Sequence, residues 1–197
     1  MPLGIAELLG LVRRSLEGDS VATILTEAAF ANYRLSYGPA RDPITDKIAN
    51  DDELILQTED QGLEPWEDGP GQHLMPPPPT SSQLEGNPRY LWVVRDTDVV
   101  ASPEYCSFGQ QLCTGSVKHT NLTGGSAAYA GGEMIKIDDR TICVIGWSGR
   151  YPVRCAAELD ALAKAFRESG YSVWSMGFDE ETMMPNPFVG VQPRLVA

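Results

Sequence analysis

Residues 134–145, MIKIDDRTICVI, contain two runs of strand-forming residues on either side of a short polar turn. β-Branched residues are favoured in strands, and a short polar turn commonly joins antiparallel strands. This stretch therefore predicts a β-hairpin whose turn lies at residues 138–140. Upstream, residues 90–94 (YLWVV) have the pattern of a buried strand, and residues 96–98 predict a turn into a second strand around Val99 and Val100.

A helix is predicted after the second hairpin, from about residue 156 to residue 169. Pro152 precedes it, and Gly170 stands where helices commonly end in a left-handed residue. A last strand is expected near residues 172–174. The order of strands, helix and strand predicts an α+β fold rather than a doubly wound α/β sheet. The predicted apolar face of the helix is formed by Leu159, Leu162, Ala163 and Phe166.

The front half of the chain has a different pattern. Apolar residues recur at helical spacing over residues 5–12 and 21–29, and Gly18-Asp19-Ser20 supplies a break and an N-cap, so two short helices are predicted. Glycine and proline accumulate over residues 69–79, which favours extended or mobile chain. We therefore predict a helical N-terminal extension (1–56), an acidic, proline-rich linker (57–88) and an α+β domain (89–197).

Charge restricts the partners. The formal net charge is -12, and ten acidic residues but only one basic residue lie between positions 42 and 68. Such a chain is repelled by phosphate backbones, so no nucleic-acid partner is expected. The acidic segment is interpreted either as a solvated face or as a docking surface for a basic partner. No apolar run reaches the roughly 18 residues that a spanning helix needs, so no membrane partner is expected, and a cleaved signal peptide is not expected either.

The four cysteines, at positions 106, 113, 143 and 155, form no CxxC pair. Structural zinc sites and dithiol redox motifs commonly contain such a pair, so no metal is expected. Free thiols and at least one disulfide both remain open.

The first candidate site is residues 118–125, KHTNLTGG, which bring an imidazole, hydroxyl groups and two glycines together. We interpret this stretch as a ligand-binding loop that leaves a strand. In this interpretation His119 donates a hydrogen bond to a sugar hydroxyl or an amide, and Gly124 and Gly125 leave room for a flat group. The alternative is a turn with a structural histidine. His73 lies in the predicted linker and is taken to have no role.

Two further stretches carry candidate groups. Residues 127–133, AAYAGGE, end in Glu133, which could polarise a ribose hydroxyl or act as a base, or could face solvent at a strand edge. Residues 147–152, WSGRYP, carry aromatic rings that could hold a nicotinamide or adenine ring, or could simply pack in the core. A hydrolase that uses Ser148 and His119 is a weaker alternative because no acid is positioned by a recognisable motif, and the sequence has no GxSxG elbow. Walker and Rossmann glycine motifs are also absent from the sequence.

Together the three stretches resemble a known pattern, KHSSxLAGG followed by AAGE, a hairpin, SGHYxP and a helix. It occurs in the C-terminal region of plant IQ-motif calmodulin-binding proteins and in uncharacterised bacterial and fungal proteins. The pattern is also similar to the bacterial effector family that transfers ADP-ribose to threonine on ubiquitin. The resemblance covers residues 89–175 of this chain.

This resemblance implies an ADP-ribosyltransferase-like fold with a split β-sheet cleft that binds NAD. It implies that His119, on the first strand, contacts the ribose or nicotinamide with support from Thr120, that Tyr151 stacks on nicotinamide, and that Glu133 orients the ribose or the acceptor. Electrostatic stabilisation of an oxocarbenium-like ribose would supply the catalysis. The other positions that the resemblance places in the NAD site are Asn121, Gly124, Gly125, Ser148 and Gly149.

The sequence departs from the pattern at three places, and the first is His119-Thr120-Asn121, where the pattern has HSS. Arg150 stands where the pattern has its second histidine, and Glu133 precedes Tyr151 although the usual transferase order places the glutamate last. Glu180 or Glu181 would restore that order.

The resulting hypothesis is an NAD-dependent mono-ADP-ribosyltransferase that acts on a protein, with threonine of ubiquitin as the specific expectation. It would work in the cytoplasm, or as a secreted effector in the cytoplasm of a target cell. The hypothesis expects His119→Ala to remove transfer and leave the fold intact. The alternative is a non-catalytic interaction module, of a calmodulin-associated or immunity type, whose acidic segment docks a basic protein.

Overall fold

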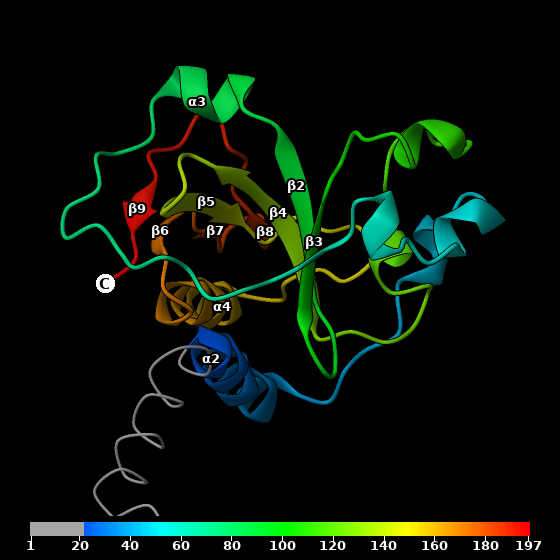
Figure 1. The fold of residues 1–197 in the computed structure, drawn as a ribbon, viewed down its shortest axis with the longest axis horizontal. Helices are drawn as coiled ribbons and strands as arrows, with labels where there is room; N and C mark the ends of the chain where they lie inside the picture. Colours follow the sequence, from blue (N-terminus) through cyan, green and yellow to red (C-terminus); the bar gives the residue numbers. More distant parts are fainter. Residues whose placement is uncertain (1–21) are drawn as a thin grey trace, which may run out of the picture.

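A computed structural model describes residues 22–197, which form a seven-stranded sheet with two helices packed on one face (Figure 1). The helix predicted over residues 5–12 lies outside the described residues. The strand order is β1-β3-β2-β4-β5-β6-β9, and β7 and β8 form a separate two-stranded sheet. The helices are α2 (Ala22–Tyr37), α3 (Ser81–Gly86) and α4 (Ala156–Glu168). The strands are β1 (Glu64–Pro65), β2 (Arg89–Val94), β3 (Val99–Pro103), β4 (Ala130–Lys136), β5 (Thr141–Ile145), β6 (Ser172–Ser175), β7 (Phe178–Asp179), β8 (Met184–Pro185) and β9 (Arg194–Leu195).

The sheet confirms both predicted hairpins and the α+β class. β2 pairs antiparallel with β3, and β4 pairs antiparallel with β5. β4 also pairs antiparallel with β2, which joins the two hairpins in the centre of the sheet. α4 then carries the chain to β6, which pairs parallel with β5. A parallel neighbour needs such a crossover, and the helix provides it.

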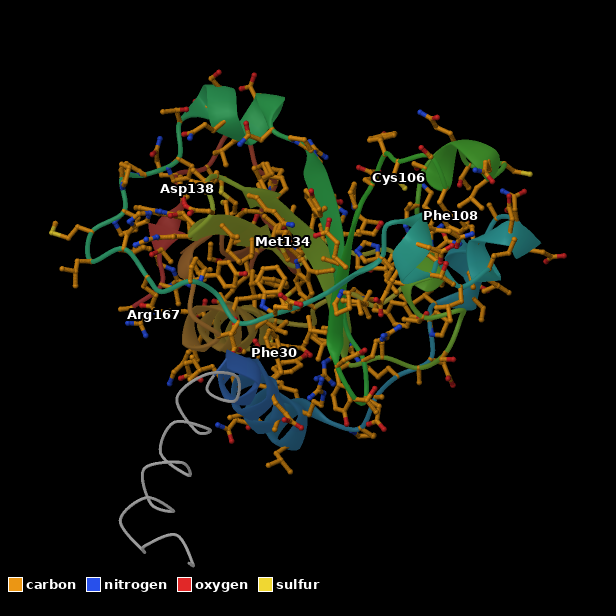
Figure 2. The ribbon with its side chains drawn as sticks, in the orientation of Figure 1. Phe30, Cys106, Phe108, Met134, Asp138 and Arg167 are labelled. Carbon is orange, nitrogen blue, oxygen red and sulfur yellow. The ribbon has the colours of Figure 1, made fainter. Side chains whose placement is uncertain are left out.

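The helix side of the sheet is the main core. Phe166 on α4 contacts Phe30 on α2 with ring centroids 5.0 Å apart, and it contacts Trp92 on β2 at 5.3 Å. All three rings are completely buried. Figure 2 shows Phe30 and Met134 in this region, and both side chains belong to the same buried cluster. The second predicted helix therefore packs into the core and is not a separate extension.

The opposite face of the sheet carries two separate clusters. One, here called the lobe cluster, packs the sheet against residues 104–128; Phe108 belongs to it and Cys106 packs against it (Figure 2). The other, here called the C-terminal cluster, joins β4, β5 and β6 to α3 and the chain near Phe188. Glu133 lies between these clusters, because its register partners Leu91 and Ile145 belong one to each cluster.

Part of the segment predicted as a linker, residues 57–88, packs into the sheet and its core. β1 pairs antiparallel with β3, and the Trp66 ring contacts Phe166 and Tyr171 at centroid distances of 5.1 and 4.8 Å. Gly69 donates a backbone hydrogen bond to the carbonyl of Ser169 at 2.7 Å. Proline is tolerated in edge strands. The proline-rich composition that predicted a linker is therefore compatible with packing at the sheet edge.

The four cysteines are free thiols, which settles the alternative left open by the sequence. Among residues 22–197 no helix is both long enough and apolar enough to cross a membrane.

Candidate functional site

The three candidate stretches, which lie up to about 30 residues apart in the chain, meet at Gly131 and Gly132 on β4. His119 Nε2 lies 2.9 Å from the carbonyl oxygen of Gly132, and the amide of Gly131 donates to the carbonyl of Tyr151 at 2.8 Å. A Cβ atom on Gly131 would lie 2.9 Å from His119 Cδ2 and 3.3 Å from Ser148 Oγ. Glycine is therefore required for this close approach. We call these five residues the motif junction.

His119 is buried in the junction and does not line an open cleft. It begins the 3-10 helix His119–Leu122 instead of lying on a strand, and only 6% of its surface is exposed. Burial lowers its pKa to about 4, so the ring is neutral near pH 7. Nε2 then donates to the Gly132 carbonyl, which leaves Nδ1 as a hydrogen-bond acceptor. This position corrects the expectation that His119 is a strand residue facing a ligand.

Tyr151 is also a packed residue. Only 2% of its surface is exposed, and its ring belongs to the lobe cluster. Its hydroxyl lies 2.7 Å from Thr123 Oγ1 and donates to the carbonyl of Ser126 at 2.7 Å. Burial raises its pKa. The ring therefore offers no face for stacking on nicotinamide in this arrangement, contrary to the expectation from the resemblance.

Ser148 supports the turn that leads to Tyr151. Its Oγ accepts hydrogen bonds from the backbone amides of Tyr151 at 3.0 Å and Arg150 at 3.3 Å. Within residues 22–197 no hydrogen bond joins Ser148 Oγ to the His119 ring, so the nucleophile and the base that the weaker hydrolase alternative needs are not paired. At Gly149, the tip of this turn, an added Cβ would meet nothing within 4 Å, so this tip is open to its surroundings.

The remaining predicted positions hold residues 52–57 against the 3-10 helix His119–Leu122 and the glycines that follow it. Asn121 donates from Nδ2 to the carbonyls of Asp52 and Ile55, at 2.9 Å each. Gly124 and Gly125 have φ angles of +62° and +79°, which favour glycine. A Cβ atom at either position would contact Leu54 or Leu56, so the glycines accommodate protein and not a flat ligand. The hydroxyl of Thr120 is buried and has no hydrogen-bond partner within residues 22–197.

Arg150, which replaces the second histidine of the resembled pattern, holds a buried carboxylate. Its guanidinium lies 2.5 Å from Glu53 Oε2, and the Glu53 side chain is almost completely buried. Glu53 Oε1 also accepts from the amide of Ala49. The departure at this position therefore has a structural reason, because an uncharged histidine would leave the Glu53 carboxylate without its counter-ion.

Glu133 is the carboxylate at the junction that remains partly open. It follows Gly132 directly, and its β-register partners are Leu91 of the lobe cluster and Ile145 of the C-terminal cluster. Its side chain is 18% exposed and lies 3.6 Å from Arg89. The pKa of the Glu133 carboxyl is raised above its ordinary value. Burial is the main cause, the Arg89 guanidinium opposes it, and the Glu104 carboxylate adds to it.

Glu180 and Glu181 have a different setting. Both are exposed, and they lie in the turn between β7 and β8. Neither belongs to the junction, so Glu133 is the carboxylate that the fold places beside the three stretches. Arg89 and Glu104 are neighbours of Glu133 that no sequence pattern indicates. Arg89 sits two positions before Leu91 on β2, so only the strand register reveals the pairing.

Two hollows of about 570 and 560 Å³ lie elsewhere, and both are lined in part by Pro65, Trp66 and Glu67. None of the predicted site residues lines either hollow. Among residues 22–197 no group of three or more histidine, cysteine, aspartate or glutamate side chains is arranged to hold a metal ion.

Comparisons with protein-family models, with curated proteins and with solved structures find no match to this chain. Its fold is α+β with a mostly antiparallel sheet.

Proposed function

We propose that this protein is an NAD-dependent mono-ADP-ribosyltransferase that modifies a protein side chain, with threonine of ubiquitin as the first acceptor to test. The observation that supports the proposal is the meeting of three separate stretches at β4, directly beside a partly open glutamate. The proposal includes the transferase-like architecture, although the seven main strands here form one continuous sheet and not a split one.

Glu133 carries the chemistry in this proposal. NAD is the substrate, and the bond between nicotinamide nitrogen and ribose C1′ breaks with its electron pair leaving on nicotinamide. The Glu133 carboxylate stabilises the positive charge that develops on the ribose. The acceptor hydroxyl oxygen then bonds to C1′, and its proton passes to Glu133. A raised pKa suits this last step, because it makes the carboxylate a stronger base.

The other residues have supporting roles. Arg89, 3.6 Å from Glu133, supplies a cation for the NAD pyrophosphate. Trp147 is 41% exposed and follows β5 two positions after the register partner of Glu133, so it replaces Tyr151 as the aromatic residue proposed to contact a flat ring. His119 becomes a positioning residue, because its hydrogen bond to Gly132 holds the strand immediately before Glu133.

The test compares Glu133→Gln with Glu104→Gln, a matched removal of a neighbouring partly buried carboxylate. Purified full-length protein is incubated with labelled NAD and ubiquitin, and the label on ubiquitin is measured. Loss of the base and electrostatic stabiliser should lower transfer by roughly 100-fold or more in Glu133→Gln. Glu104→Gln should stay within about threefold of wild type. Equal transfer by both variants contradicts the role of Glu133, and a wild type that neither transfers label nor binds NAD in calorimetry contradicts the proposal.

The second candidate is the non-catalytic module that docks a basic protein. It is favoured by the hollow of about 570 Å³, whose lining includes five carboxylates, those of Glu59, Glu64, Glu67, Asp138 and Asp139, and one cation, Lys136, which pairs with Glu64. Deletion of residues 42–68 is not a clean test of this candidate, because it would also remove β1 and the contacts of Trp66 with the core. Glu67→Lys, at an exposed position, is the cleaner probe. It should weaken partner binding, and added salt should weaken wild-type binding in the same way.

A further inference from the structure

Three consecutive aliphatic side chains are exposed in the segment of residues 52–57 that Asn121 holds in place. Leu54, Ile55 and Leu56 are 41%, 50% and 48% exposed, and they lie in the cyan segment on the side of the molecule opposite β6 and β9 (Figure 1). Single exposed aliphatic residues are ordinary, but a run of three leaves an apolar patch open to water. We call these three residues the aliphatic strip.

The strip is held rigidly by the same loops that build the junction. Asn121 donates to the carbonyl of Ile55, and the amide of Gln57 donates to the carbonyl of Asn121 at 2.8 Å. An added Cβ on Gly125 would lie 2.9 Å from Leu54 Cδ2. Glu53, immediately before the strip, forms the buried ion pair with Arg150. A surface fixed in this way loses little conformational entropy when a partner binds.

The strip has an acidic border. One 3-10 helix, Asp51–Leu54, ends at the first residue of the strip, and another, Glu59–Gln61, follows the strip; both carry acidic residues. Asp46, Asp51, Glu59 and Asp60 are exposed, whereas Lys47 is the only basic residue between positions 42 and 60. An apolar patch with an acidic border is complementary to an apolar patch that is surrounded by lysine and arginine.

We propose that the aliphatic strip is the docking surface for the protein acceptor, and that this acceptor presents an apolar patch bordered by basic residues. The inference rests on the proposed function, because it identifies the acceptor of that reaction. It places the acceptor on the loops that also hold β4 and Glu133, so docking and transfer would use one connected part of the molecule.

The experiment measures binding and transfer separately, with fluorescently labelled ubiquitin as the probe. The test variant is Ile55→Arg, which places a positive charge in the strip, and the matched control is Leu74→Arg, at a fully exposed aliphatic residue outside the strip. Circular dichroism and thermal unfolding check that both variants are folded. Leu56→Ser is a milder second variant in case Ile55→Arg fails to fold.

We expect ubiquitin binding to weaken at least tenfold in Ile55→Arg, to remain within twofold in Leu74→Arg, and to weaken for the wild type when salt is raised from 20 to 300 mM. Transfer to ubiquitin should fall in parallel with binding. The rate at which NAD reacts with water, measured as nicotinamide released in the absence of ubiquitin, should stay unchanged.

Three results would overturn the inference: no ubiquitin binding by the wild type, equal binding by both variants, or a wild-type dimer in sedimentation that Ile55→Arg dissociates. Binding that depends on the strip, without any transfer, leaves the docking surface standing and contradicts the proposed function. Transfer to ubiquitin that Ile55→Arg does not change supports the proposed function and contradicts the docking surface.

Discussion

Acid should destabilise this protein through His119, and the size of the effect follows from its burial. The pKa of its ring is lowered from an ordinary value of 6.5 to about 4 in the folded state. Between these two values the unfolded chain binds a proton that the folded chain does not. The stabilising contribution is therefore complete above pH 6.5 and is lost as the pH falls through 4. The difference of about 2.5 pH units corresponds to roughly 3 kcal/mol.

The assay is urea unfolding at several pH values between 7 and 4 for wild type, His119→Gln and His73→Gln. Glutamine keeps an N–H donor for the Gly132 carbonyl but does not titrate, so the stability advantage of wild type over His119→Gln should shrink by roughly 3 kcal/mol across this range. His73→Gln controls for an exposed histidine, since His73 lies at the surface beside Asp138. Parallel curves for wild type and His119→Gln would refute a buried, neutral His119.

The same geometry reverses the expectation that His119→Ala leaves the fold intact. Alanine removes a buried ring and leaves the Gly132 carbonyl without its hydrogen-bond donor. Lost activity in that variant would therefore not separate chemistry from folding, and Glu133→Gln is the sharper probe of catalysis.

Three further predictions test the packing. Gly132→Ala should destabilise the protein by about 3 kcal/mol or more in thermal unfolding, because its Cβ would lie 2.2 Å from the carbonyl oxygen of Ile145. Arg150→Ala should cost about 3–5 kcal/mol in urea unfolding by leaving Glu53 buried without a counter-ion, and a second change, Glu53→Gln, should recover part of the loss. Burial raises the pKa of Cys143 to about 12, so mass spectrometry after treatment of the native protein with iodoacetamide at pH 8 should find this thiol unmodified.

The parts of the fold that the sequence predicted are those with a local pattern. The hairpin over residues 134–145 and the helix that ends before Gly170 each carry their own periodicity and their own turn or cap residues. Local propensity and the tertiary fold agree in these segments, so short windows of sequence were enough.

The linker and the N-terminal extension could not be predicted in this way. Trp66 is one aromatic residue in an acidic, proline-rich stretch, and its burial depends on Phe166 and Tyr171, about 100 residues later. A two-residue strand such as β1 has no periodicity of its own. Its existence depends on the free edge that β3 offers.

The candidate site was likewise predictable from the sequence only in part. By residue type and a resembled pattern, the sequence identified the three stretches and Glu133. It could not show that His119 and Tyr151 are buried, because the same side chains suit a ligand cleft and a packed junction equally well. Nor could it pair Arg150 with Glu53, which lie 97 positions apart.

The sequence by itself determined the class of fold, the central strands, the main helix and the strong acidic charge, because each of these follows from local pattern or composition. Only the tertiary structure decided which polar groups are buried and satisfied, which carboxylate stays partly open, and that an aliphatic strip faces water. The physical reason is that burial and charge pairing are set by contacts between residues distant in the chain, which no local pattern records.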